Sequence, residues 1–95
     1  MPLRVSAAAG ADLVAIRVYG YEHYGERAAE AYLTALVRMF DRIVEWPHAA
    51  RVRIEIQPPV RLVVFSAHNI FYDVEADRAE IVRVLHHSID WQTEL

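Results

Sequence analysis

Two adjacent histidines, His86 and His87, have the side chains that most readily suggest chemistry. Imidazole titrates near neutral pH, so either ring could act as a general acid or base, or could hydrogen-bond to the backbone at a strand end. Adjacent residues on a strand point to opposite faces of a sheet, so we expect the two rings to lie apart and not to share a metal ion. The sequence therefore predicts neither a metal site nor a cofactor.

Arg83 is the second residue with evident chemical potential, because a guanidinium group donates two parallel hydrogen bonds to a phosphate or a carboxylate. Strict alternation along its predicted strand places it on the same face as Ile81 and Leu85. An arginine among apolar neighbours is not simply solvated. We expect it either to pair with an acid such as Asp73 or Glu75, or to belong to a functional surface.

The charges are unevenly distributed along the chain. All ten basic residues are arginine, and with thirteen acids the formal net charge is −3. Residues 38–61 hold five arginines and three acids, a net charge of +2, whereas residues 62–95 hold two arginines and six acids, a net charge of −4. Nonspecific nucleic-acid binding needs a basic excess to replace counterions on the phosphates, and this chain lacks one. The basic cluster, either solvated or facing a partner, consists of Arg51, Arg53 and Arg61.

Length and composition limit the class of protein. A chain of 95 residues is long enough for one domain with a thin core, which we expect to span residues 1–95. The absence of cysteine excludes disulfides and is compatible with a reducing compartment. We expect no membrane span, because the apolar runs are far shorter than about 18 residues. We also expect no signal peptide, because Met1–Val5 lacks the layout of one.

Two helices are predicted in the N-terminal half, as an antiparallel hairpin over about residues 7–46. Apolar residues recur there at intervals of three and four, as they do on one face of a helix. Ser6 stands where an N-cap would accept a backbone N–H, and Gly25 can adopt the left-handed conformation that ends the first helix. The Trp46-Pro47 pair ends the second helix, because proline disfavours a helical residue before it.

A second apolar line on the first helix consists of Val14, Val18 and Tyr21. This line either packs within the domain, against the other helix or a sheet, or stays exposed and covers a partner. Exposed apolar stripes of this kind mark sites of protein interaction.

The C-terminal half predicts strands. Residues 51–57 alternate between apolar and polar side chains up to Pro58, which is a strand signal. Three further segments are rich in β-branched and aromatic residues and are joined by connections short enough for hairpins. These segments are residues 60–65, 69–74 and 80–86. Helices followed by strands indicate an α+β fold: a short N-terminal strand, the helical hairpin, then a three-stranded antiparallel meander over about residues 60–87 and a tail at 88–95.

The segments His68–Glu75 and Glu80–Trp91 resemble the last two strands and the tail of ParE toxins in the RelE/ParE superfamily. The N-terminal half, for example residues 11–13, is similar to the helical hairpin of that family. The resemblance covers nearly the whole chain, and its most specific element is the Arg-Val-Leu-His run at 83–86 followed by Asp90. The chain departs from the family pattern at Ala49-Ala50, Pro59, Ala67 and Arg17. The resemblance also implies that residues 52–56 form a loop or a minor strand rather than a full strand.

The resemblance implies a bacterial cytoplasmic toxin of a type II toxin–antitoxin module that inhibits DNA gyrase. It also implies neutralisation by a cognate ParD-type antitoxin, a ribbon-helix-helix protein that binds operator DNA and wraps the toxin with its C-terminal segment. The toxin would then belong to a hetero-oligomer and would meet DNA only through the antitoxin. For antitoxin binding we expect the apolar line and the basic cluster, namely Val14, Val18, Tyr21, Arg51, Arg53 and Arg61.

For gyrase inhibition we expect the last strand and the tail, with Arg83, His86, Ile89 and Trp91 as the candidate residues. An exposed tryptophan near a chain end is typical of an interface anchor. The alternative for Trp91 is that it packs back on the domain.

The alternative function is that of a ribosome-dependent mRNA endonuclease like RelE. Such chemistry needs a general base, a general acid and cations that stabilise the developing charge on the phosphate. Arg61, Arg83 and His86 could supply these groups. The chain has no lysine, no tyrosine after Tyr72 and an acidic C-terminal third, so its charge distribution favours a gyrase inhibitor over a nuclease.

Overall fold

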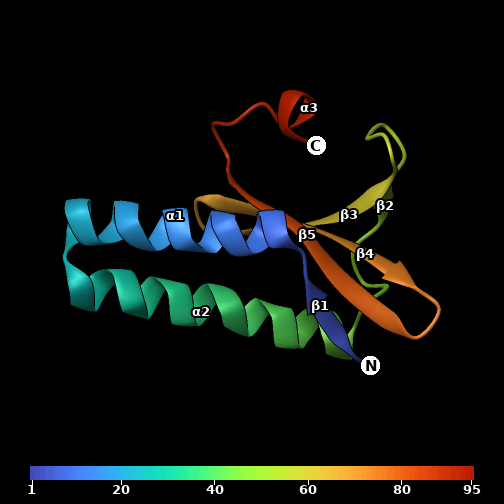
Figure 1. Cartoon of the computed structure of the whole chain (residues 1–95). Helices are drawn as coiled ribbons and strands as arrows, with labels where there is room; N and C mark the ends of the chain where they lie inside the picture. The colour runs from blue at the N-terminus through green and yellow to red at the C-terminus, as the bar shows by residue number, and fades with distance from the viewer.

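A hairpin of two long helices and a five-stranded sheet form the two layers of the molecule, in a computed structural model that describes all 95 residues (Figure 1). Gly25 alone joins α1 (Ala7–Tyr24) to α2 (Glu26–Glu45). The Ser6 hydroxyl accepts a hydrogen bond from the backbone N–H of Ala9 at 3.0 Å, and Gly25 has a φ of +87°. The predicted N-cap and the predicted end of the first helix are therefore confirmed. The chain contains no helix of the length and apolarity that a membrane crossing requires.

The sheet is mixed. Its strand order is β1-β5-β4-β3-β2, with β1 parallel to β5 and the other neighbours antiparallel. The remaining elements are β1 (Leu3–Val5), β2 (Val52–Arg53), β3 (Val60–Phe65), β4 (His68–Glu75), β5 (Arg78–His86) and the short helix α3 (Trp91–Glu94). The α+β class, the N-terminal strand, the helical hairpin and the antiparallel meander are all confirmed. The sheet is larger than the meander because β1 and β2 extend it at its two edges.

The strand signal over residues 51–57 is correct only near its start, and the segment forms the minor strand that the family resemblance allows there. Only Val52 and Arg53 pair with β3, and they form β2. The backbone N–H of Ile56 then donates to the carbonyl of Arg53 at 3.3 Å, so the chain turns instead of extending. The turn buries Ile56 against the sheet and leaves Ile54 exposed, so the alternating pattern does not correspond to two strand faces.

A bulge in β5 changes which residues share a face. The pairing of β5 with β4 skips Val82, so the alternation of side chains shifts by one residue there. Ile81 and Val84 consequently belong to the same buried cluster, whereas Leu85 belongs to a cluster on the other side of the sheet. The expectation that Arg83 shares one face with both Ile81 and Leu85 is therefore wrong.

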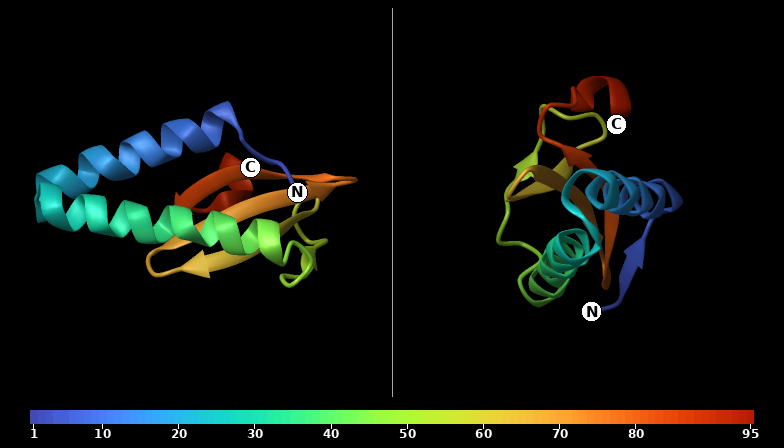
Figure 2. Two further views of the ribbon diagram at one scale, coloured as in Figure 1. Left: turned by 90° about the horizontal axis from the view of Figure 1, so that it is seen from below. Right: turned by 90° about the vertical axis from the view of Figure 1, so that its left-hand side faces the viewer.

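Apolar side chains are buried on both faces of the sheet. The larger cluster joins the helices to the sheet, and the helices run along this face and extend beyond the sheet at their closed end (Figure 2). It includes Ala9, Leu36, Phe40, Ile70 and Ile81. The smaller cluster lies on the opposite face and is partly covered by the tail. It consists of Ile56, Val60, Phe71 and Leu85.

The two glycines inside α1 offer a matched test of the helix contact. A Cβ atom on Gly20 would lie 2.9 Å from the Cβ of Ala29, whereas one on Gly10 would have no neighbour within 4 Å. We expect Gly10→Ala to raise the free energy of unfolding by about 0.5–1 kcal/mol, through helix propensity. We expect Gly20→Ala to lower it by about 1–2 kcal/mol, because overpacking exceeds that gain. Urea unfolding measures both, and an equal gain in the two variants would contradict the close helix approach.

Candidate functional site

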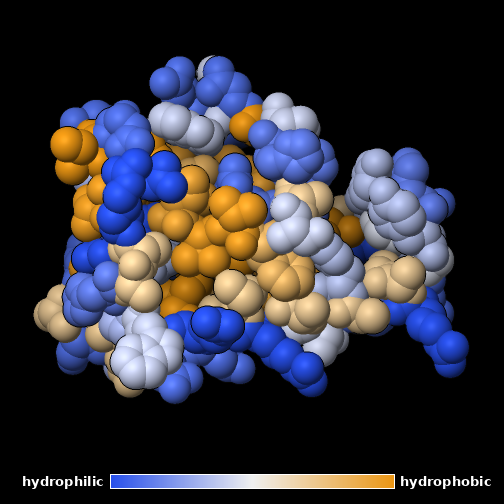
Figure 3. Space-filling view, turned by 180° about the vertical axis from the view of Figure 1, so that it is seen from behind, coloured by the Kyte–Doolittle hydropathy of each residue, from blue (hydrophilic) through white to orange (hydrophobic).

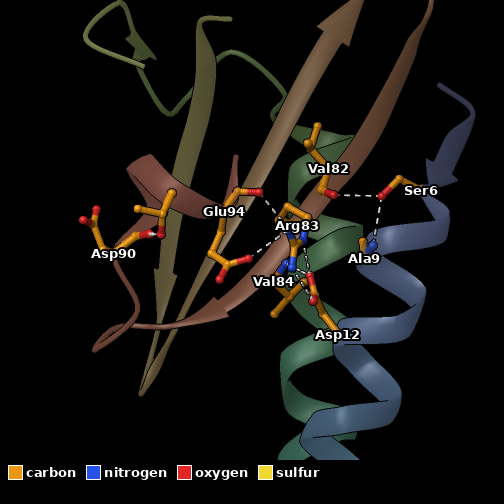
Figure 4. Close-up of polar contacts among 9 residues, drawn as sticks. Ser6, Ala9, Asp12, Val82, Arg83, Val84, Asp90 and Glu94 are labelled. Atoms are coloured by element: carbon orange, nitrogen blue, oxygen red, sulfur yellow. Dashed lines mark hydrogen bonds and ion pairs between the residues drawn. The ribbon is translucent and has the colours of Figure 1, made fainter. Parts of the chain in front are cut away.

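Asp12 of α1 is bound to the outer edge of β5. Its carboxylate accepts hydrogen bonds from Nε of Arg83 at 2.8 Å, from Nη2 of Arg83 at 2.9 Å and from the backbone N–H of Val84 at 2.9 Å (Figure 4). Both side chains are largely buried, with 13% of Asp12 and 20% of Arg83 exposed. Arg83 therefore does pair with an acid, but with Asp12 rather than Asp73 or Glu75.

Ser6 makes a second link to the same strand. Its hydroxyl donates to the carbonyl of Val82 at 2.8 Å while it caps α1 by accepting from Ala9 (Figure 4). β1 pairs with β5 only as far as Ile81, so Ser6 and Asp12 take over where that pairing ends. Ser6 and Asp12 thus satisfy the Val82 carbonyl and the Val84 N–H at this edge of the sheet.

Arg83 also holds the C-terminal tail. Its Nη1 donates to the backbone carbonyl of Glu94 at 3.0 Å and lies 3.9 Å from the carboxylate of that residue. The hydrogen bonds that Arg83 donates to Asp12, and the negative charges of Asp12 and Glu94, raise the pKa of Arg83 against the opposing effect of burial. Arg83 is consequently a permanent cation that joins helix, sheet and tail.

The tail packs back on the sheet. Asp90 caps α3 by accepting from the backbone N–H of Gln92 at 3.0 Å. Trp91 and Leu95 then lie against the smaller apolar cluster. Of the four candidates for gyrase contact, His86 and Ile89 are exposed, whereas Arg83 and Trp91 are partly buried and secure the tail.

Three histidines gather where β5 ends. The rings of His86 and His87 stack with their centroids 4.4 Å apart, and His68 meets His86 edge-on at 5.5 Å. The prediction that His86 and His87 point to opposite faces is wrong, because β5 ends at His86 and His87 lies in the following turn. Nδ1 of His86 accepts from the backbone N–H of Ser88 at 3.2 Å, and the Tyr32 hydroxyl lies 2.7 Å from Nδ1 of His68.

The groups of a nuclease site are not assembled. Arg61 lies at the start of β3, whereas His86 is level with the other end of that strand, four residues or about 13 Å away. The Arg61 guanidinium donates to the carbonyl of Ala50, and Arg83 is held by Asp12. No three His, Asp or Glu side chains are arranged to hold a metal ion.

The three residues of the predicted apolar line on α1 are all exposed. Val14 lines a groove of about 490 Å³ between α1 and α2, together with residues such as Leu13, Arg17, Leu33, Val37 and Arg38. Val18 lies outside this groove. Tyr21 donates a hydrogen bond to the carboxylate of Glu30, which raises the pKa of the tyrosine.

The basic cluster lies around β2 and the start of β3. Arg51 is 3.6 Å and Arg53 is 3.8 Å from the carboxylate of Glu55. Nε of Arg53 is buried without a hydrogen-bond partner. Arg51 and Arg53 therefore both pair with Glu55, and Arg61 lies on the neighbouring strand β3.

Asp12 and Tyr32 were absent from the residues proposed from sequence. Asp12 is one of two acids in α1, and its partners on β5 are 71 and 72 residues away. Tyr32 belongs to an apolar line of α2 and meets a histidine that follows it by 36 residues. The sequence signals are an acid or a hydroxyl beside the apolar residues of a predicted helix and, for Asp12, its position in the segment 11–13 that resembles the family.

Removing the Asp12 carboxylate is expected to lower the free energy of unfolding by about 2–4 kcal/mol. The substitution Asp12→Ala leaves a partly buried guanidinium and a backbone N–H without their acceptor. A matched control is Arg4→Ala, which breaks the exposed pair with Glu80 (N–O distance 3.1 Å) and costs less than about 1 kcal/mol. Urea unfolding measures both variants. Equal losses in the free energy of unfolding would show that the Asp12 contacts contribute no more to stability than an exposed ion pair.

The histidine cluster predicts a loss of stability in mild acid. Burial, followed by the charges of His86 and His87, lowers the pKa of His68 below its usual value. Above about pH 6.5 this ring is neutral in both folded and unfolded chains. As the pH falls through this value, the unfolded chain gains a proton that folded His68 resists, so the free energy of unfolding declines until the folded pKa is passed. Between pH 7.5 and 5, wild type should therefore lose more stability than His68→Gln, and identical pH profiles would contradict this assignment.

Comparison with known proteins identifies the family. Residues 3–91 match the family described as the ParE toxin of the type II toxin–antitoxin system parDE. Toxin ParE1 of Mycobacterium tuberculosis (strain H37Rv) is 36% identical over 87 residues, which cover 90% of this chain and 89% of that toxin. Toxin ParE1 of Caulobacter vibrioides is 32% identical over 94 residues, which cover 99% of this chain and 97% of that toxin.

A solved structure shares the fold. The chromosomal ParDE toxin–antitoxin system from P. aeruginosa contains a chain that superposes with a TM-score of 0.80 at 20% identity, covering 90% of this chain and 95% of that one. The structural likeness establishes only the fold. Membership of the family is established by the family match and the sequence relatives. This chain belongs to the ParE toxins of type II toxin–antitoxin systems.

Proposed function

We propose that this ParE toxin inhibits DNA gyrase in the bacterial cytoplasm and is neutralised by a cognate ParD-type antitoxin. The observation that supports inhibition by binding, rather than by RNA cleavage, is the separation of Arg61, Arg83 and His86. A nuclease needs its acid, base and cations around one phosphate. In this chain Arg83 is hydrogen-bonded to Asp12, and His86, which is on β5, is level with the end of β3 opposite to Arg61.

The groove between α1 and α2 is the proposed seat of an antitoxin helix. Amphipathic helices bind such grooves through apolar anchors one turn apart. Val14 and Val37 offer exposed apolar surface here, and Arg38 offers a charge for an acidic partner residue. Val18 and Tyr21 continue the exposed apolar surface of α1 next to the groove.

The open edge of β3 is the proposed seat of an extended antitoxin segment. β2 pairs only with Val60 and Arg61, so residues 62–65 have no strand on their outer side. All four are apolar, and 62% of Val64 is exposed. The side of the molecule where β3 lies carries a central gathering of apolar side chains (Figure 3). Unpaired strand edges accept an extended peptide through backbone hydrogen bonds.

The basic cluster is the proposed binding site for acidic residues of the antitoxin segment. Arg51, Arg53 and Arg61 lie at the end of the open edge, and the side chains of Arg51 and Arg53 are partly exposed. Carboxylates of the antitoxin would accept charge-assisted hydrogen bonds from the accessible nitrogens of these guanidinium groups. The resulting complex is a hetero-oligomer that meets operator DNA only through the antitoxin.

The C-terminal strand and tail are the proposed gyrase contact. His86 and Ile89 present exposed side chains for this contact. Arg83 and Trp91 contribute by fixing the tail on the sheet.

Gyrase inhibition is tested with purified toxin, gyrase and relaxed plasmid, beside translating ribosomes with a defined mRNA. We expect loss of supercoiling with intact mRNA, and recovery of supercoiling when the ParD-type antitoxin is added. Codon-dependent mRNA cleavage that Arg61→Ala or His86→Ala abolishes would instead support the endonuclease.

The same assay tests the groove. Val14→Glu should inhibit gyrase as wild type does but should need roughly tenfold more antitoxin for relief, because a carboxylate replaces an apolar anchor. Leu3→Glu changes an exposed apolar residue outside the groove and serves as the control. Unchanged antitoxin relief of Val14→Glu would place the antitoxin elsewhere.

A further inference from the structure

Three aromatic rings are clustered and exposed at the closed end of the helical hairpin. Tyr19 and His23 are one helical turn apart and stack with their centroids 3.8 Å apart and their planes at 16°. Tyr24 is tilted against both rings, at 6.3 Å from Tyr19 and 6.4 Å from His23. The exposed fractions of Tyr19 and Tyr24 are 55% and 69%. These residues are in the last turns of α1, and none of them belongs to either buried cluster. The closed end of the hairpin extends beyond the sheet (Figure 2).

The cluster is preorganised. Nδ1 of His23 lies 2.9 Å from the backbone carbonyl of Tyr19, and a carbonyl can only accept. Nδ1 therefore carries the hydrogen, and Nε2 of the neutral ring is left as an acceptor. Ring stacking and this hydrogen bond fix the side chains before any partner arrives, which reduces the entropy lost on binding.

The chemistry of this end of the hairpin suits a cation. Glu22 and Glu26 are close to the three aromatic residues in the sequence, are exposed and take part in no ion pair. Arg27 is the one neighbouring cation without a partner. The two carboxylates, the free Nε2 of His23 and the exposed faces of the tyrosine rings all attract a cation. An arginine or lysine is held by such a set through cation–π contact and charge-assisted hydrogen bonds.

We propose that this aromatic tip, formed by Tyr19, His23 and Tyr24 with Glu22 and Glu26, docks on an arginine- or lysine-bearing segment of the toxin's protein target. This proposal rests on the proposed inhibition of gyrase and adds a second contact to the tail. An enzyme that binds DNA must present basic surfaces to the phosphates. A nucleic acid does not fit the tip, because phosphates would meet two unpaired carboxylates.

The test compares four purified proteins for binding to gyrase and for inhibition of supercoiling. They are wild type, Tyr19→Ala/Tyr24→Ala, Tyr19→Phe/Tyr24→Phe and Glu22→Gln/Glu26→Gln. The tyrosines lie outside both buried clusters, so thermal unfolding should be little changed in every variant. We expect the alanine pair to weaken gyrase binding by roughly tenfold to thirtyfold, as loss of an aromatic anchor does. The phenylalanine pair keeps the π-faces and should bind within about twofold of wild type.

Salt dependence and antitoxin binding complete the experiment. The glutamine pair should bind gyrase more weakly at low salt and with a flatter dependence on ionic strength, because its carboxylates no longer attract a cation. All variants should bind the antitoxin as wild type does. Wild-type-like gyrase inhibition by the alanine pair would overturn the aromatic-tip proposal and leave gyrase inhibition standing. Loss of antitoxin binding by the alanine pair would assign the tip to the antitoxin instead. If wild type itself did not inhibit gyrase, the proposed function would fail, and the tip proposal with it.

Discussion

From Val82 onward, β5 has no β1 residue paired with it on its outer side, and the carboxylate of Asp12 joins the Ser6 hydroxyl in hydrogen-bonding to this edge. It accepts three N–H groups, two from Arg83 and one from the backbone of Val84. A partly buried carboxylate is costly unless its oxygens are fully hydrogen-bonded and paired with a cation, and here both conditions hold. The same contact fixes α1 against the sheet, and with α1 the whole hairpin.

This ion pair also determines which groups remain for chemistry. A guanidinium that is shared between Asp12 and the carbonyl of Glu94 cannot approach a phosphate without leaving both. The tail that it holds brings Trp91 and Leu95 onto the second apolar cluster. Arg83, a candidate cation of a nuclease site, thus has a structural role. The exposed candidate functional groups lie elsewhere on the surface.

Sequence signals that act over a few residues predicted the helices and the long strands. They could not predict contacts between residues far apart in the chain. The helices follow from a repeat of three and four residues and from two end signals, Ser6 and Gly25, that act within one turn. The three long strands follow from their β-branched content. The bulge at Val82 consists of one extra residue, and no sequence pattern predicts it. After the bulge, each side chain of β5 points to the opposite face from the one that strict alternation predicts. The partners of Asp12 are more than 70 residues away, so its role follows only from the folded chain.

The proposed antitoxin groove and the aromatic tip are neighbours on the same two helices. Arg17 and Glu30 close the groove at the end nearest the tip, and Tyr21 hydrogen-bonds to Glu30. Tyr19 is two residues from Arg17, so its side chain points to a different side of α1 from the groove. Under the two proposals, the antitoxin helix and the target would occupy neighbouring parts of the hairpin. Exclusion of the target by a bound antitoxin would then depend on the size of the two partners and would need no change in the conformation of the toxin.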